Sequence, residues 1–594
     1  MMSLDQAPIN QLITDNIDVW TSTVKTKATT GRGSNKKLEL YGVKKLRELI
    51  LELAVRGKLV PQDSSDEPAS ILLERIAEEK AQLVKEKKIK KSKVLPVVSE
   101  EEQSFVLPKG WAWERIGTFG VVGTGATPSR SKPEYWEPAE FNWVSSGETS
   151  ELFVSETKER ISGLAIEETN VSIYPKGTLI VAMYGQGKTR GQITELLESA
   201  GTNQACAAIQ LVELSQDHKN YVKLFFRKAY LDLRSQAAGG AQPNLNVGKI
   251  SNTVIPVPPL LEQHRIVAKV DELMTLCDQL EQQTEASIEA HQVLVTTLLD
   301  TLTNSANAEE LMQNWQMVAE HFDTLFTTEE SIDQLKQTIL QLAVMGKLVP
   351  QDPNDESAAK LLERIAEEKA QLVKEKKIKK QKALPPITDN EKPFELPKGW
   401  EWERVGTFGV VGTGATPSRS NPKYWDSPDH NWVSSGETAS LFVGQTKEKV
   451  SELAIKETNV SVYPVGTLIV AMYGQGKTRG QITELSEPAG TNQACAAISL
   501  IEPNTAHKDF VKLYFRKSYE ELRSNAAGGA QPNLNVGKVQ NTVIAVPPLE
   551  EQHRINVMVH SLLELCESLK CNLTKAQSTQ LHLTDAIVEQ CDTM

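Results

Sequence analysis

A long segment that occurs twice constrains this chain more than any other feature. The first copy begins with LPKGW at residues 107–111 and ends with EQHRI at residues 262–266. The second copy carries the same sequences at residues 396–400 and 551–555, an offset of 289 residues at both ends. Solenoid repeats have periods of roughly 20–50 residues, so this much longer period predicts a duplicated domain.

The bulk composition indicates an ordinary soluble protein with room for several domains. The 594 residues are 40% hydrophobic and 24% charged, and no apolar run reaches the roughly 18 residues of a membrane span. The first 16 residues lack the pattern of a secretory signal, so we expect a cytoplasmic protein. The net charge of −12 argues against a protein that coats nucleic acid through bulk charge, but it leaves local contact with DNA open.

The six cysteines are scattered and form no CxxC pair. Cys206 and Cys495 are equivalent positions of the repeat, and so are Cys277 and Cys566. Both pairs stand among apolar or heptad residues. We therefore expect buried thiols rather than disulfides or zinc ligands.

Two helices are predicted ahead of each copy. The first has apolar residues at helical spacing from Leu46 to Leu53, and Gly57 is suited to cap it. The second follows Pro68, places Ile71, Leu72, Ile76 and Leu83 on one side, and ends in a lysine-rich run at residues 85–93. That run could contact nucleic acid, but a solvated helix end whose cations offset the helix dipole is the simpler interpretation.

Inside each copy the pattern changes to short β-branched runs between Gly, Pro, Asn and Ser turns. We expect one helix at residues 219–236 and strands at residues 121–122, 142–144, 178–182, 207–211 and 253–257. This pattern predicts a compact, mostly β, α/β module that is large enough to bury its own core.

A long helix with a heptad stripe follows each module. Its a/d positions are Ile266, Val270, Leu273, Cys277, Leu280, Thr284, Ser287, His291, Leu294 and Leu298 in the first copy, and Ile555, Val559, Leu562, Cys566, Leu569, Leu573, Ala576, Gln580, Leu583 and Ile587 in the second. A helix of ~43 residues would be ~64 Å long. We expect the two stripes to pair antiparallel as a coiled coil within one chain.

The predicted fold class is α+β, with two duplicated α/β, mostly β modules joined by long coiled-coil helices around a pseudo-twofold axis. The expected parts are a lead-in at 1–42 with a short helix near 8–19, helices at 43–95, the first module at 105–258, a long helix, connector and helices at 259–385, the second module at 394–547 and a C-terminal long helix at 548–594.

We find no catalytic motif. GQGKT at residues 185–189 resembles the end of a phosphate loop, but the first glycine of that motif would fall at Ala182. There is no HExxH, no GxSxG and no methyltransferase signature of the Asn-Pro-Pro-Tyr type. His264 and His553 begin the long helices, where packing is the simpler role. The sequence therefore predicts neither an enzyme nor a metal site.

Polar loops of the modules carry side chains of the types that contact DNA. Residues 184–192 follow a buried strand and contain three glycines, which let the backbone approach a ligand closely. Arg and Lys suit guanine or phosphate, and Gln and Asn suit adenine. A single glycine-rich hairpin is usually only a turn, but several such loops in one module favour DNA readout.

The candidate DNA-binding residues fall in these loops of both modules. They are Thr127, Ser129, Arg130, Ser145, Ser146, Tyr184, Gln186, Lys188, Thr189, Arg190, Gln192, Asn203, Gln204, Gln242, Asn244 and Asn246, and then Thr416, Ser418, Arg419, Ser434, Ser435, Tyr473, Gln475, Lys477, Thr478, Arg479, Gln481, Asn492, Gln493, Gln531, Asn533 and Asn535.

Several motifs resemble those of the specificity (S) subunits of type I restriction–modification enzymes. They are LPKGW, Thr127-Pro-Ser followed by Tyr135-Trp136, NQAC at 203–206, VPPL at 257–260 with EQHRI, and GKLVPQD at 57–63 and 346–352. The resemblance implies two target-recognition domains, each reading half of a bipartite site in double-stranded DNA. It also implies helices that dock two methyltransferase (M) subunits, with restriction (R) subunits joining them. S-adenosylmethionine, ATP and Mg would then be cofactors of the partners, with none in this chain.

The reading loops of the two modules have the same sequence. Residues 184–192, 202–204 and 242–246 equal residues 473–481, 491–493 and 531–535. Identical readers related by a twofold axis read the same bases on opposite strands, so we predict an interrupted palindrome. Two other functions stay open at this point: the specificity subunit of a type IIB-like fused system, or a coiled-coil scaffold whose β modules bind proteins.

Overall fold

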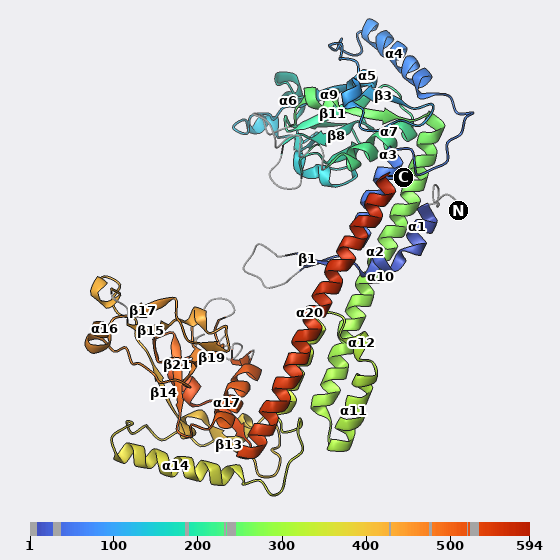
Figure 1. The fold of residues 1–594 in the computed structure, drawn as a ribbon. Coiled ribbons are helices and arrows are strands. Elements are labelled where there is room, and N and C mark those ends of the chain that lie inside the picture. Colours follow the sequence, from blue (N-terminus) through green and yellow to red (C-terminus); the bar gives the residue numbers. More distant parts are fainter. Residues whose placement is uncertain are drawn as a thin grey trace. The chain divides into compact units, whose positions relative to one another are not determined.

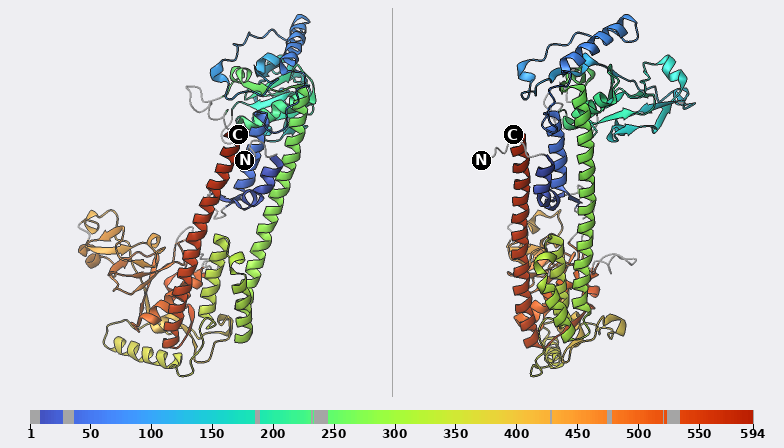
Figure 2. Two further views of the ribbon diagram at one scale, coloured as in Figure 1. Left: turned by 45° about the vertical axis from the view of Figure 1, so that its right-hand side comes forward. Right: turned by 90° about the vertical axis from the view of Figure 1, so that its right-hand side faces the viewer.

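The computed structural model divides into two compact units, and each is assembled from separate parts of the chain (Figure 1). It describes residues 9–27, 37–184, 189–230, 233, 245–426, 429–473, 478–519, 521–522 and 534–593. Unit 1 comprises residues 1–29, 35–286 and 577–594, and unit 2 comprises residues 30–34 and 287–576. The long helices α10 (Leu260–Asn304) and α20 (Leu549–Thr593) are both continuous (Figure 2), and each begins in one unit and ends in the other.

The predicted module at residues 105–258 lies in unit 1; it and its copy at 394–547 are called the recognition domains, after the domains that the family resemblance implies. The recognition domain of unit 1 contains two mixed sheets, with strand orders β4-β11-β8-β9-β6 and β10-β5-β7. Their bounds are β4 (Gly120–Thr124), β5 (Phe141–Val144), β6 (Phe153–Val154), β7 (Glu159–Ile161), β8 (Leu179–Ala182), β9 (Ile193–Leu196), β10 (Ala200–Thr202) and β11 (Cys206–Leu211). A separate pair joins β3 (Ala112–Arg115) to β12 (Val254–Val257). Strand β8 is buried along its whole length because it is central in the larger sheet. All five predicted strand positions are confirmed.

The recognition domain of unit 2 repeats this topology, with orders β14-β21-β18-β19-β16 and β17-β15-β20 and the pair β13–β22. The bounds are β13 (Glu401–Arg404), β14 (Gly409–Thr413), β15 (His430–Val433), β16 (Phe442–Val443), β17 (Glu448–Val450), β18 (Leu468–Ala471), β19 (Ile482–Leu485), β20 (Ala489–Thr491), β21 (Cys495–Leu500) and β22 (Val543–Val546). The duplicated domain predicted from the repeat is therefore confirmed, with the same strand order in both copies.

Each recognition domain carries one amphipathic helix, α7 (Gln216–Lys228) or α17 (Thr505–Lys517). Tyr221, Val222 and Phe226 of α7 are buried. The helix begins at Gln216, ahead of the predicted start at residue 219, because Asp217 in the first turn suits a helix start. In both units this helix contacts the first of the two helices that precede the domain, which is α3 (Tyr41–Val55) in unit 1 and α13 (Glu329–Val344) in unit 2.

The turn after α3 has the predicted glycine cap. Gly57 has φ +70°, and a Cβ there would lie 2.8 Å from the Trp111 ring. Both the left-handed backbone and the close packing therefore require glycine at this position.

Helices α4 (Ala69–Lys85) and α14 (Ala358–Lys374) depart from the prediction in two respects. The lysine-rich run 85–93 leaves the helix after its first residue, Lys85, because α4 ends there in a Schellman turn. Lys87 has φ 58°, and the backbone N–H groups of Lys88 and Lys87 donate to the carbonyls of Leu83 and Val84. Ile71 is 42% exposed rather than on the buried side, which consists of Ala69, Leu72 and Ile76.

The first half of each heptad stripe packs within its own unit. Ile266, Val270, Leu273, Cys277 and Leu280 are at most 8% exposed, and Arg47 of α3 pairs with Asp278 and Glu281 of α10. In unit 2, Ile555, Val559 and Cys566 join the core formed with α13, whereas Leu562 and Leu569 are half-buried. The antiparallel pairing of the two stripes stays a prediction.

In the second half of each long helix, the buried face lies one residue later in the sequence than the predicted heptad positions. Leu294 is 50% exposed, whereas Val295, Leu299 and Leu302 are buried. The same shift makes Leu583 47% exposed and buries Thr584. A strict heptad repeat has 3.5 residues per turn, whereas an α-helix has about 3.6, so the buried face advances by about one residue over eight turns.

Short helices pack on the far end of each long helix. In unit 2, α11 (Ala308–Glu320) and α12 (Phe322–Leu325) place Val318 and Leu325 in the same core cluster as Val295. In unit 1, α1 (Ile9–Asp15) and α2 (Ile17–Ser22) stand where one short helix was predicted. Thr23, just after α2, bonds Thr584 of α20, and Tyr41 bonds Asp585. The lead-in and the connector therefore perform equivalent structural roles.

Cys206, Cys277, Cys495 and Cys566 are free and buried, as predicted. Across the described ranges, no helix combines the length and apolarity that crossing a membrane requires.

Candidate nucleic-acid interface

The loops predicted to read DNA meet at one end of each recognition domain. Strands β4, β5, β8 and β10 all end there, and β11 begins there. The Thr202 Oγ1 donates to the Val144 carbonyl at 2.9 Å, and the Thr124 Oγ1 donates to the Cys206 carbonyl at 2.8 Å. A Cβ at Gly125 would lie 1.6 Å from the Thr202 carbonyl oxygen, so the loop after β4 can lie directly against β10 only with glycine there. We call this end of the domain the reading end.

Hydrogen bonds join the separate loops at the reading end. The Thr127 hydroxyl donates to Gln204 Oε1 at 2.6 Å, and its counterpart Thr416 donates to Gln493 at 2.5 Å. The Met183 N–H donates to the Ala205 carbonyl at 2.7 Å, and the Leu245 N–H donates to the Met183 carbonyl at 3.2 Å. Four loops that are distant in sequence are thus brought together.

Several candidate side chains use their polar atoms to shape these loops. The Ser145 N–H and hydroxyl both donate to the Glu148 carboxylate, at 2.8 and 2.9 Å, in a capping box. Asn203 Oδ1 accepts from the Ala205 N–H at 3.0 Å, and Asn246 caps α9 (Val247–Asn252). Ser434, Asn492 and Asn535 repeat these contacts in unit 2. These hydrogen bonds hold the reading end in shape.

The described C-terminal part of the loop between β8 and β9 is held against the sheet, where the Gly191 N–H donates to the Ala182 carbonyl at 2.9 Å. The Gln192 N–H donates to the Thr189 carbonyl at 3.0 Å, and Gly191 has φ +87°. Tyr184, Thr189, Arg190 and Gln192 are half-buried. In unit 2 the Thr438 hydroxyl also donates to Gln481 Oε1, at 3.2 Å. Thr478 and Arg479 are half-buried as in the first copy, and Tyr473 is 36% exposed.

Arg130 makes both a bidentate ion pair and an aromatic contact. Its guanidinium donates to both oxygens of Glu159, at 2.5 and 2.8 Å, and lies 3.9 Å from the centroid of the Trp136 ring. The pKa of Glu159 is lowered, primarily by these hydrogen bonds. The second domain repeats the arrangement with Arg419, Glu448 and Trp425, at 2.6, 2.9 and 3.8 Å. We call each set the Arg–Glu pair.

The remaining candidates divide into two groups. Ser129 bonds the Ser131 hydroxyl at 2.8 Å and accepts from Trp136 Nε1 through its carbonyl at 3.2 Å, and Ser418 does the same with Ser420 and Trp425. Ser146 and Ser435 accept from Thr149 and Thr438 through their carbonyls. Eight candidates lie outside the described residues: Gln186, Lys188, Gln242, Asn244, Gln475, Lys477, Gln531 and Asn533.

Sequence reasoning missed Glu159, Glu448 and the tryptophans of the Arg–Glu pairs. Two short 3-10 helices and two strands separate Arg130 from Glu159, so no periodicity links them. The sequence could have indicated these residues only because each occurs again 289 residues later, and many residues with purely structural roles do the same.

The EQHR motif forms the junction between each recognition domain and its long helix. Buried Glu262 accepts hydrogen bonds from Trp111 Nε1 at 2.9 Å and Gln62 Nε2 at 2.6 Å. Burial raises the pKa of its carboxyl, although these donors oppose the shift. Arg265 pairs with Asp66, and exposed His264 contacts Asp217. The motif therefore orients the helix, and this geometry offers no nucleophile with a base beside it.

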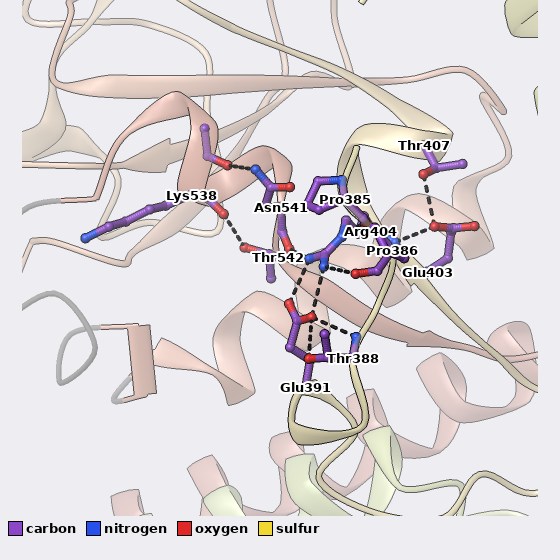
Figure 3. Close-up of polar contacts among 11 residues, drawn as sticks. Pro385, Pro386, Thr388, Glu391, Glu403, Arg404, Thr407, Lys538, Asn541 and Thr542 are labelled. Carbon is purple, nitrogen blue, oxygen red and sulfur yellow. Dashed lines mark hydrogen bonds and ion pairs between the residues drawn. The ribbon is translucent and has the colours of Figure 1, made fainter. Parts of the chain in front are cut away.

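A buried arginine attaches the extended segment after α14 to the recognition domain of unit 2 (Figure 3). Arg404 donates to the carbonyls of Pro385, Pro386 and Asn541, at 2.8, 3.1 and 2.6 Å, and pairs with Glu391 at 2.9 Å. The hydrogen bonds from Arg404 and Thr388 lower the pKa of Glu391 to about 2. Arg115 makes the equivalent contacts in unit 1. The frame of each domain is thereby tied to the helix that precedes it.

Among the described residues, no group of three or more His, Cys, Asp or Glu side chains is placed to hold a metal ion. In its described part, the candidate interface consists of loops on two sheets that carry Arg130 and Arg190 in one domain and Arg419 and Arg479 in the other. It can offer hydrogen bonds and positive charge to a polyanion.

Comparison with known families defines the class of protein. The family model described as the type I restriction modification DNA specificity domain matches residues 108–290 and again residues 397–576. The chain therefore belongs to the family of type I restriction–modification specificity subunits, which recognise DNA.

Individual relatives are similar over nearly the whole chain. The EcoAI specificity subunit of Escherichia coli is 40% identical, over 98% of this chain and 99% of its own length. The EcoEI specificity subunit of Escherichia coli is 39% identical over the same shares. Among solved structures, the HsdS subunit of Thermoanaerobacter tengcongensis is 18% identical, with a TM-score of 0.40 over 82% of this chain and 98% of its own.

Proposed function

We propose that this specificity subunit reads an interrupted palindrome, with one recognition domain on each half-site. The observation that supports this most strongly is the equivalence of the two reading ends. The Thr127–Gln204 bond is 2.6 Å and its counterpart is 2.5 Å, and the two Arg–Glu pairs agree within 0.1 Å. Two recognition domains that present the same hydrogen-bond donors in the same positions select the same bases. The two half-sites therefore have the same sequence in opposite orientations.

The separation of the half-sites follows from duplex geometry. Two domains that approach one face of DNA contact half-sites about one helical turn apart, which is ~34 Å or about 10 base pairs between centres. The bases between them form a spacer whose length, but not sequence, matters.

The chain acts with catalytic partners and has no catalytic role of its own. Methyltransferase subunits, two per chain, supply S-adenosylmethionine-dependent methylation of an adenine in each half-site, and restriction subunits supply ATP- and Mg-dependent cleavage. The absence of catalytic motifs from the sequence supports this division. Purified chain without partners should transfer no methyl group to DNA, and activity from the chain alone would refute it.

The test is to co-express the chain with the methyltransferase genes encoded beside it and map N6-methyladenine in the host DNA. We expect one motif that reads the same on both strands, with a spacer of fixed length. Two unrelated half-sites would refute the symmetric target, although they would leave the family assignment unchanged.

A further inference from the structure

The Arg–Glu pair of each domain lies at the reading end. Arg130 belongs to the loop after β4, in which Thr127 bonds Gln204. Glu159 begins β7, where it is the register partner of Trp143 in β5. Strand β5 ends at the next residue, and the Ser145 loop follows. A group that contacts the reading loops would therefore also meet this ion pair.

The ion pair is exposed and can be broken at small cost. The Arg130 and Glu159 side chains are 57% and 40% exposed, and their counterparts are 56% and 43% exposed. Exposed ion pairs contribute only about 0–1 kcal/mol. The aromatic contact differs from the ion pair because it uses the face of the guanidinium, whereas the carboxylate occupies its N–H edge. The arginine can thus exchange its hydrogen-bond partner while it stays stacked on Trp136.

The carboxylate has the same hydrogen-bonding chemistry as two groups of DNA. A guanidinium binds paired acceptors bidentately, and a phosphate and the O6/N7 edge of guanine both present such a pair. Glu159 therefore occupies the position that either group of bound DNA would take.

We propose that Glu159 and Glu448 are positioning residues that stand in for DNA and lock the reading arginines until the target displaces them. This deepens the proposed function, on which it rests. Any DNA must break the ion pair before the arginine can bind, and only a correctly placed pair of acceptors replaces both hydrogen bonds. The two carboxylates therefore weaken binding to unrelated DNA more than binding to the target.

The test uses the full chain co-purified with its methyltransferase subunits. Three variants are compared with the wild type: Glu159→Gln with Glu448→Gln, Arg130→Met with Arg419→Met, and all four substitutions together. The matched control is Glu168→Gln with Glu457→Gln, which removes the same charge from carboxylates that bond tyrosine hydroxyls. Dissociation constants are measured by fluorescence anisotropy for the duplex identified by methylation mapping and for an unrelated duplex of the same length.

We expect the Glu→Gln pair to bind the unrelated duplex more tightly, by up to about fivefold per copy, with a smaller gain for the target. The gain should vanish when both arginines are also replaced, and the control should show none. If the four-substitution variant still binds the unrelated duplex more tightly, the effect is only the loss of charge repulsion between the carboxylates and DNA. If Glu159→Gln with Glu448→Gln does not tighten binding, the ion pair has only a structural role. Both results overturn the proposal. A wild-type protein that fails to discriminate the two duplexes would instead refute the proposed function.

Salt dependence and base analogues distinguish the two acceptor sources. If Arg130 binds phosphate, Arg130→Met with Arg419→Met should reduce the slope of log K against log salt by about one per lost contact. If it binds guanine, the slope should stay unchanged, and 7-deazaguanine at one position of each half-site should reproduce the loss in the wild type.

Discussion

At the scale of single residues, several described polar side chains at the reading end serve the fold. Ser145, Asn203 and Asn246 were predicted as DNA contacts because of their residue type, yet each caps or closes a turn. Residue type alone cannot separate the two roles, because the same oxygen that accepts from a base also accepts from a backbone N–H. The structure brings these loops to one end of the domain because the short strands that carry them end or begin there.

A buried histidine should make stability depend on pH. His507 is buried, and its Nδ1 lies 3.1 Å from Gln552 Oε1. Burial lowers the pKa of His507 to about 4. In the unfolded chain the imidazole takes up a proton near pH 6.5, so between pH 6.5 and 4 protonation favours unfolding. Each pKa unit corresponds to about 1.4 kcal/mol, which gives a loss on the order of 3 kcal/mol over that window.

This prediction is tested by thermal unfolding across pH 4–7. His507→Asn keeps a donor for Gln552 but does not titrate, so its melting temperature should fall less steeply with acid than that of the wild type. The control for the substitution itself is His553→Asn, because His553 is exposed and lies outside the buried His507–Gln552 contact. Equal slopes for wild type and His507→Asn would show that the buried imidazole does not control acid stability.

At the scale of elements, helix ends and buried faces were predicted less well than the elements themselves. Helix α4 was expected to continue into the lysine-rich run, because lysine is a good helix former. The chain instead turns at Lys87 with a positive φ, a conformation that favours glycine. Nothing in the sequence marks this position, since the Schellman turn depends on backbone hydrogen bonds to Leu83 and Val84.

Replacing the left-handed lysine with glycine should stabilise the end of α4. Lys87→Gly removes the Cβ strain at φ 58°, with a gain of up to about 1 kcal/mol. Amide hydrogen exchange at Lys88, whose N–H closes the turn, should slow. Lys85→Gly is the matched comparison and should destabilise the helix by about 1 kcal/mol, because it lies within the last turn. Faster exchange in Lys87→Gly would contradict this account of the turn.

The shifted stripe of α10 makes a second prediction at this scale. Leu273 is 1% exposed, whereas Leu294, which occupies the equivalent heptad position, is 50% exposed. Leu273→Ala should therefore destabilise the protein by about 2–5 kcal/mol, and Leu294→Ala by less than about 0.5 kcal/mol. Chemical denaturation of both variants measures the difference. If the two variants lose similar free energies of unfolding, the buried face follows the strict heptad positions and this account of the shift is wrong.

At the scale of the whole molecule, the repeat predicted most of the architecture. Because the offset is 289 residues throughout, each strand of one recognition domain has its counterpart in the other. What the repeat could not predict is that each unit takes its short helices from different parts of the chain. Helices α1 and α2 come from the lead-in, whereas α11 and α12 come from the connector, and the two pairs share no sequence. Their equivalence is visible only in the contacts that they make with α20 and α10.

The central claim is that the two recognition domains read the same bases. It is tested most directly by replacing residues 394–547 with a copy of residues 105–258, so that both domains have one sequence. The substituted chain is expressed with its methyltransferase subunits, and N6-methyladenine is mapped in host DNA beside the wild type. We predict that the methylated motif stays the same in both half-sites and in spacer length. A changed or newly symmetric motif would contradict the claim, because it would show that the two natural domains read different sequences.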